Sequence, residues 1–245
     1  MSTNYNGQSI TAQVPSPAMR ARILPVTVLP QDSDPFNAAA FSQQHKMIAD
    51  NSYYAANRLL YDHFLGQTTA TGLWLTPIVA GAGTVSTGED VANGASGIVA
   101  LNSGAGGSAT LQCQQLALGT TDFKMYFRVR VSGVTATSSL SFGLVSGAGS
   151  AELRFYVQGS VSTTNWRVAV DSVPTAPNGT PAAISASYAD FVISRQSNVA
   201  IFSVNGTTLH TVNPYSTSAN TGFVRLSAST AGIINCDVAE LVANI

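Results

Sequence analysis

The stretch that decides the fold is Phe191-Val-Ile-Ser-Arg-Gln-Ser-Asn-Val-Ala-Ile-Phe-Ser-Val-Asn-Gly-Thr-Thr-Leu-His-Thr-Val212. β-Branched and aromatic residues lie on both sides of Asn205-Gly206. Asn and Gly both tolerate the positive φ angles that a type I′ turn needs. Residues 199–204 and 207–212 are therefore predicted to pair as an antiparallel hairpin. A turn at 196–198 joins this hairpin to the strand before it.

The same alternation recurs along the C-terminal part of the chain. In Phe123-Lys-Met-Tyr-Phe-Arg-Val-Arg-Val131, apolar and polar side chains alternate, as in a strand with one buried face. A series of such segments, separated by turns, indicates a two-sheet antiparallel sandwich. The residues predicted to fill its core are Phe127, Val129, Phe142, Phe155, Phe191, Phe202 and Val204.

The chain divides into four predicted segments. Residues 1–33 contain Pro15, Pro17, Pro25 and Pro30 and are predicted to form an extended N-terminal arm. Residues 34–66 are predicted to form one helix, from the Asp34-Pro35 start signal to Gly66. Its apolar stripe is interrupted by polar residues. The helix is therefore expected to pack either on its own β domain or on symmetry-related subunits. Residues 67–107 are a Gly/Ser-rich connection with the first strands, and residues 108–245 are the sandwich.

The arm is expected to anchor the chain to a partner. Its prolines exclude a helix, and about 30 extended residues can reach on the order of 100 Å. The candidate assembly residues are Ile23, Leu24, Val26, Val28 and Leu29. Such a segment binds by strand addition or by placing these side chains in grooves.

The order of strand, Arg195, short turn, strand, Asn205-Gly206 and strand resembles that of concanavalin A-like, laminin-G-like jelly rolls. The segment Asp237-Val-Ala-Glu-Leu-Val242 resembles the closing strand of such folds. The resemblance covers residues 72–245 and is concentrated in 188–242. It implies a mainly β, antiparallel jelly-roll sandwich, but no single activity, because the same sandwich serves lectins, glycosidases, adhesins and virion proteins.

Charge sets further expectations. Charged residues make up 9% of the chain and the formal net charge is −1, against about 25% charged residues in ordinary soluble domains. Little electrostatic repulsion opposes association, so a homo-oligomer is expected, with a trimer the favoured state. Clustered basic residues are missing, which argues against nucleic-acid binding.

No apolar run approaches the roughly 20 residues needed to span a membrane. The N-terminal residues Met1-Ser-Thr-Asn-Tyr-Asn-Gly-Gln do not resemble a signal peptide, so synthesis in the cytoplasm is expected.

Catalytic patterns are weak. Retaining glycosidases on this fold place carboxylates in a Glu-x-Asp-x-x-Glu type pattern on one strand, because acid and nucleophile must lie about 5 Å apart. The three glutamates, Glu89, Glu152 and Glu240, are far apart in the sequence. The histidines have no chelating spacing, and no phosphate-binding loop is present. The sequence therefore predicts no enzyme, no metal and no cofactor.

Two pairs of residues have open roles. Trp166 and Tyr188 are candidate contacts for a glycan or a protein partner, although aromatic residues in alternating strands also fill cores. Cys113 and Cys236 are predicted to lie in the first and last strands of the sandwich, where they form either a disulfide or two buried thiols.

The arm, the helix and the sparsely charged jelly roll together look like the virion proteins of tailed bacteriophages. The sequence thus favours a non-enzymatic structural protein of the virion, either a capsid decoration (cement) protein or a tail-fibre or adaptor subunit. Its expected partners are further copies of itself and major capsid or tail proteins. The alternative is a carbohydrate-binding, lectin-like or receptor-binding module of a phage fibre, with a host-surface glycan as its ligand.

Overall fold

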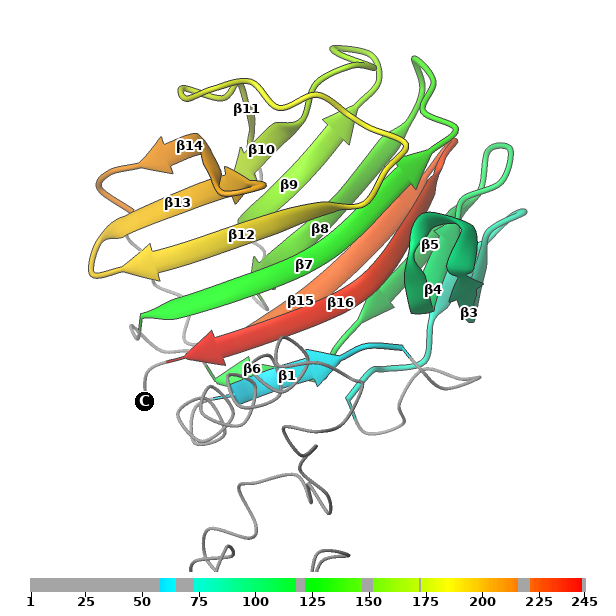
Figure 1. Ribbon diagram of the computed structural model, residues 1–245, viewed down its shortest axis with the longest axis horizontal. Helices are drawn as coiled ribbons and strands as arrows, with labels where there is room; N and C mark the ends of the chain where they lie inside the picture. Colours follow the sequence, from blue (N-terminus) through cyan, green and yellow to red (C-terminus); the bar gives the residue numbers. More distant parts are fainter. Residues whose placement is uncertain are drawn as a thin grey trace, which may run out of the picture. The chain divides into compact units, whose positions relative to one another are not determined.

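The computed structural model describes residues 58–64, 73–117, 122–146, 152–171, 173–215 and 221–243. They form a sandwich of two antiparallel sheets (Figure 1). The first sheet has the order β14 (Thr207–Val212), β13 (Val199–Val204), β12 (Ala189–Gln196), β7 (Phe123–Ser132), β16 (Ile233–Ala243), β4 (Ala95–Asn102) and β3 (Thr84–Asp90), and β1 (Arg58–Asp62) also pairs with β16. The second has the order β11 (Val173–Thr175), β10 (Arg167–Val170), β9 (Glu152–Gln158), β8 (Ser139–Ser146), β15 (Thr221–Ser229), β5 (Ser108–Gln112) and β2 (Ile78–Ala80), and β6 (Leu116–Ala117) pairs with β15.

The predicted hairpin is confirmed. Strands β13 and β14 pair antiparallel, and Val204 lies opposite Thr207 across the turn. Asn205 has a φ of 48° and Gly206 a φ of 78°, the two positive angles of a type I′ turn. The strand that precedes the hairpin, β12, pairs with both β13 and β7. This local signal therefore places three neighbouring strands of the first sheet.

The core lies between the sheets and is rich in aromatic rings. Phe142 of β8 contacts Phe127 and Phe191 of the opposite sheet, with ring centroids 5.3 and 5.0 Å apart. It also contacts Phe155 and Trp166, each at 5.5 Å. The predicted core is confirmed, since these residues are all buried: Phe127, Val129, Phe142, Phe155, Phe191, Phe202 and Val204.

The prediction of a helix over residues 34–66 is wrong where the structure tests it. Residues Arg58–Asp62 form β1, which pairs with β16, and the Leu60 side chain is buried in the core. Backbone pairing and burial of Leu60 outweigh the local helical spacing, since helix propensity is a weak preference that tertiary contacts override. Residues 34–57 lie outside the described residues, and so does the predicted arm with Ile23, Leu24, Val26, Val28 and Leu29.

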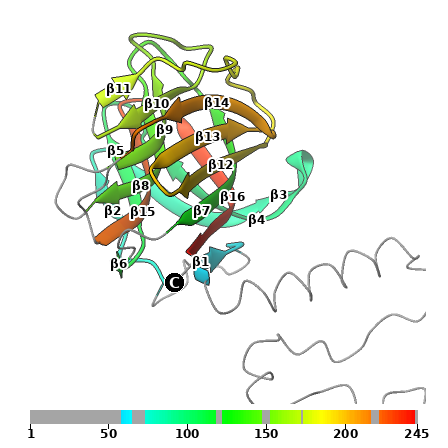
Figure 2. The same cartoon turned by 90° about the vertical axis from the view of Figure 1, so that its left-hand side faces the viewer.

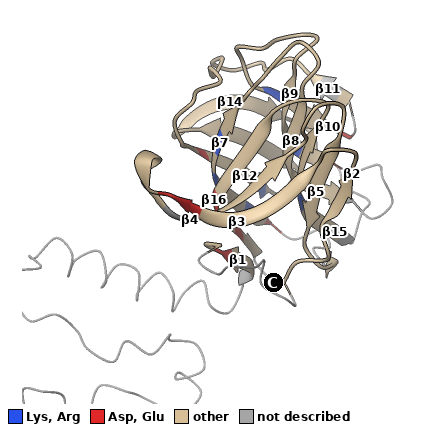
Figure 3. Ribbon diagram, turned by 90° about the vertical axis from the view of Figure 1, so that its right-hand side faces the viewer, with Lys and Arg blue, Asp and Glu red and all other residues tan. Residues whose placement is uncertain are grey.

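Among the described residues the only helical segment is the short 3₁₀ helix η2 (Val91–Asn93), between β3 and β4. No helix in this part of the chain is long and apolar enough to cross a membrane. Figures 2 and 3 show the β3–β4 end of the first sheet curling away from the second sheet. The outer face of the first sheet is therefore curved, and the η2 turn stands at its rim.

Candidate functional site

Polar side chains gather on the outer face of the first sheet. In β7 the side chains of Phe127 and Val129 point into the core, so those of Tyr126, Arg128 and Arg130 point outward. Asp190 of β12 lies directly opposite Arg128. We call the polar face the set Tyr126, Arg128, Arg130, Tyr188, Asp190, Asp237 and Glu240, together with Asp90 at the end of β3.

A β-bulge in β16 brings Asp237 to this face. Cys236 pairs with Val129 and Val238 pairs with Arg128, so Asp237 is the extra residue between them. Its carboxylate forms an ion pair with the Arg128 guanidinium, and the Asp237 side chain is 10% exposed. Arg128 also donates to the carbonyl oxygen of Gly94, just after η2, at 3.3 Å. Arg128 is thus held between the closing strand and the rim of the sheet.

Tyr188 connects Asp90, at the end of β3, with the two arginines. Its hydroxyl donates to the Asp90 carboxylate at 3.2 Å, and the Arg130 guanidinium lies 2.8 Å from the same carboxylate. Hydrogen bonds from the Asn93 amide and the Tyr188 hydroxyl, with the charge of Arg130, hold the pKa of Asp90 below its usual value. The guanidinium carbons of Arg128 and Arg130 lie 5.0 and 5.8 Å from the centre of the Tyr188 ring, within cation–π range.

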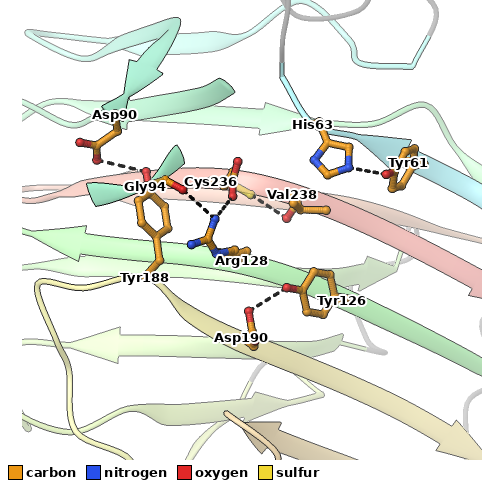
Figure 4. Close-up of polar contacts among 11 residues, drawn as sticks. Tyr61, His63, Asp90, Gly94, Tyr126, Arg128, Tyr188, Asp190, Cys236 and Val238 are labelled. Atoms are coloured by element: carbon orange, nitrogen blue, oxygen red, sulfur yellow. Dashed lines mark hydrogen bonds and ion pairs between the residues drawn. The ribbon is translucent and has the colours of Figure 1, made fainter. Parts of the chain in front are cut away.

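A second tyrosine–carboxylate pair lies on the other side of Arg128. The Tyr126 hydroxyl donates to Asp190 at 2.7 Å (Figure 4). Burial, followed by this hydrogen bond and the charge of Asp190, raises the pKa of Tyr126. The backbone N–H of Asp190 donates to the side-chain oxygen of Asn205 at 2.9 Å, so the hairpin turn fixes the position of Asp190. Asp190 itself is exposed and available to a ligand.

The face also contains a carboxylate pattern that regular alternation along β16 does not reveal. Because the bulge shifts the alternation by one residue, Asn235, Asp237 and Glu240 all project from the outer face of β16. Residues 235–240 thus read Asn-x-Asp-x-x-Glu, which matches the Glu-x-Asp-x-x-Glu type pattern except for an amide at the first position. The spacing of Asp237 and Glu240 was visible in the sequence, but strict alternation would have placed them on opposite faces.

The two predicted aromatic contacts have different places. Trp166 is 2% exposed and contacts Phe142, Phe155 and Phe191, so its ring belongs to the core. Tyr188 is half-buried on the polar face. The structure therefore brings Tyr188 to the candidate site and leaves no ring surface of Trp166 for a sugar.

The two cysteines are buried and do not belong to the polar face. Cys113 follows β5 and Cys236 lies in β16; both are buried free thiols. Burial raises the pKa of Cys113 to about 11. Within the described ranges, no group of three or more His, Cys, Asp or Glu side chains could hold a metal ion.

Comparison with solved structures identifies the fold of this chain. No protein-family model and no curated protein matches the sequence. Among solved structures, the Emp47p carbohydrate recognition domain has a TM-score of 0.57 at 12% identity and covers 78% of this chain and 99% of its own. A Bacteroides ovatus mixed-linkage glucan GH16 protein has a TM-score of 0.58 at 11% identity, over 75% of this chain and 100% of its own. The fold is a concanavalin A-like jelly roll. The resemblance inferred from the hairpin is thus confirmed for the fold.

These likenesses correct the prediction that the chain is not an enzyme. The solved structures with this fold include glycoside hydrolases, and the Crh5 transglycosylase matches with a TM-score of 0.52 at 13% identity, over 75% of this chain and 83% of its own. The exclusion was based on three isolated glutamates, and it overlooked Asp237 beside Glu240. At these identities the likeness shows the fold alone, so activity on a saccharide is a question for experiment.

Proposed function

We propose that this protein binds a carbohydrate on the polar face of the first sheet. The observation that carries the proposal is the network around Tyr188, where one aromatic ring, two guanidinium groups and the Asp90 carboxylate meet on a curved, exposed sheet surface. The likeness to a carbohydrate recognition domain supports the same function. The lectin-like alternative is therefore favoured over the structural virion role.

The chemistry of the face suits a sugar. A pyranose has an apolar C–H face and a rim of hydroxyl groups that both donate and accept hydrogen bonds. The Tyr188 ring provides an apolar surface for the C–H face. The Asp190 carboxylate can accept hydrogen bonds from the sugar hydroxyl groups, and the Arg128 guanidinium can donate hydrogen bonds to them. Ion pairs and hydrogen bonds already fix these side chains, so binding would cost little further conformational entropy.

The virion role gains no support from the solved structures named above, which are lectin, hydrolase and transglycosylase domains. Virion location, capsid or tail partners, the trimer and the anchoring arm stay predictions of the sequence. A fibre protein that recognises a host-surface glycan would use the same polar face, so the two roles are compatible.

The test is binding of the full chain to an array of neutral glycans, followed by titration of the best ligand. Tyr188→Ala should weaken binding about tenfold or more, which corresponds to about 1.4 kcal/mol. Tyr188→Phe, which keeps the ring and loses the hydrogen bond to Asp90, should retain most of the affinity. Tyr156→Ala removes the same side chain from the outer face of the second sheet and is the matched control.

Further results decide whether the polar face binds a glycan and whether the bound glycan is cleaved. Equal loss of binding in Tyr188→Ala and Tyr156→Ala, or no glycan bound at all, would count against the polar face. Release of reducing ends from the bound glycan, abolished in Glu240→Gln, would extend the function to cleavage. Binding without release would leave a lectin-like function.

A further inference from the structure

The outer face of the second sheet has two arginines on either side of a glycine. Strand pairing places Arg154 of β9, Gly143 of β8, Arg225 of β15 and Gln112 of β5 in one row across the sheet. Neighbouring strands lie about 4.8 Å apart, so the backbones of the two arginines are about 10 Å apart. Gly143 contributes no side chain between them. The next row contains hydroxyl groups from Tyr156, Ser141, Ser227 and Thr110.

Glycine is required at the centre of this row. Gly143 has a φ of 143°, and a Cβ atom there would lie 2.3 Å from the backbone oxygen of Leu153 and 2.9 Å from Cα of Arg154. Both atoms belong to the neighbouring strand and cannot move aside as a flexible side chain can. Position 143 therefore keeps a glycine, and no side chain lies there between Arg154 and Arg225.

The two guanidinium groups are incompletely neutralised. Arg154 forms an ion pair with Glu152 and donates to the Ser141 hydroxyl at 3.2 Å. Arg225 donates from Nε and Nη2 to the side-chain oxygen of Gln112, a neutral group, at 2.8 and 2.5 Å. In the part of the chain that the structure describes, Arg225 forms no ion pair. Two positive charges thus share one carboxylate.

The electrostatics point the same way. Burial, followed by the positive charge of Arg154, lowers the pKa of Arg225, so the charge of Arg154 disfavours the charged form of Arg225. An oxyanion placed between the arginines would relieve the repulsion and accept charge-assisted hydrogen bonds.

We propose that the gap over Gly143, between Arg154 and Arg225, is a second binding site that takes an oxyanion group, a carboxylate or a sulfate ester, of an acidic polysaccharide. Ser141 and Ser227 flank the gap and supply neutral hydroxyl groups. The site lies on the opposite sheet from the polar face and does not depend on the function proposed there.

The experiment uses the full chain and three immobilised polymers: polygalacturonate, which carries carboxylates, dextran sulfate, which carries sulfate esters, and neutral dextran. The protein should bind at least one anionic polymer and not neutral dextran. Binding to polygalacturonate alone would assign a carboxylate, and binding to dextran sulfate alone would assign a sulfate ester. Either result supports the site.

Substitutions test the location. Arg225→Gln and Arg154→Gln should each weaken binding about tenfold or more, since one guanidinium group bound to an oxyanion contributes on the order of 1.4 kcal/mol. Lys124→Gln removes one positive charge from the exposed outer face of β7, in the other sheet, and is the charge control, expected to bind as the unmodified chain does. Arg225→Lys keeps the charge but loses the paired N–H donors of the guanidinium. Its affinity should lie between those of Arg225→Gln and the unmodified protein. Thermal unfolding of each variant checks that it is folded.

Three results would overturn the proposal. One is a failure to prefer either anionic polymer over dextran. Another is an equal loss of binding in Lys124→Gln and Arg225→Gln, which would show a response to net charge alone. The third is full binding by a folded Arg225→Gln variant.

Discussion

Replacing Phe142 by alanine should be among the most destabilising single changes in the sandwich. Phe142 is fully buried, and its ring contacts four others: Phe127, Phe155, Trp166 and Phe191. Removing a buried Phe side chain costs about 3 to 5 kcal/mol, and each aromatic pair contributes about 0.5 to 1.5 kcal/mol beyond its buried area. We therefore expect Phe142→Ala to cost about 5 kcal/mol, the upper end of the range. In a domain of this size, that lowers the melting temperature by roughly 10 to 20 °C.

Phe142→Leu is the matched control, because it keeps most of the volume and should cost only about 1 to 2 kcal/mol. Phe202→Ala should cost about 3 kcal/mol, since the ring contacts of Phe202 are Phe155 and His210. Urea unfolding, followed by tryptophan fluorescence, measures all three changes. If Phe142→Ala costs less than about 2 kcal/mol, or no more than Phe142→Leu, the aromatic cluster is not the centre of the core.

Three other predictions concern pH, thiols and the arm. Burial lowers the pKa of His210, whose Nδ1 accepts the N–H of Asn178 at 3.1 Å, so the fold holds the neutral ring. Its stabilising contribution should be complete above the unfolded pKa of about 6.5 and be lost as pH falls below it, and His210→Gln should flatten the plot of unfolding free energy against pH. A thiol reagent near neutral pH should label neither Cys113 nor Cys236 in the folded protein and both after unfolding; no labelling after unfolding would indicate a disulfide. Deleting residues 1–33 should leave the melting temperature of the sandwich unchanged and abolish incorporation into an assembly; normal incorporation would exclude the arm as anchor.

The fold was predictable where local chemistry is decisive. Asn205-Gly206 fixes a turn type through the backbone of two residues, and the alternation in β7 shows which side chains face the core. Neither signal tells which strands become neighbours over long distances. The pairing of β1 with β16, which made the helix prediction wrong at residues 58–62, joins segments from opposite ends of the described sequence.

The site was harder to predict than the fold. Trp166 and Tyr188 both precede strands and look alike in the sequence, but one faces the aromatic core and the other the Asp90 carboxylate. The bulge that brings Asp237 next to Arg128 has no local signature, because it arises when one residue is left unpaired between two partners in β7. A single inserted residue reverses the predicted face of everything beyond it, which is why Asp237 and Glu240 were not seen as a pair.

The most direct test of carbohydrate binding is a crystal structure of the full chain with its best-bound neutral oligosaccharide. We expect one sugar ring stacked on Tyr188, with sugar hydroxyl groups about 2.7 to 3.2 Å from the Arg128 guanidinium and the Asp190 carboxylate. A saccharide bound away from the outer face of the first sheet, or bound there without contact to Tyr188 or Arg128, would contradict it.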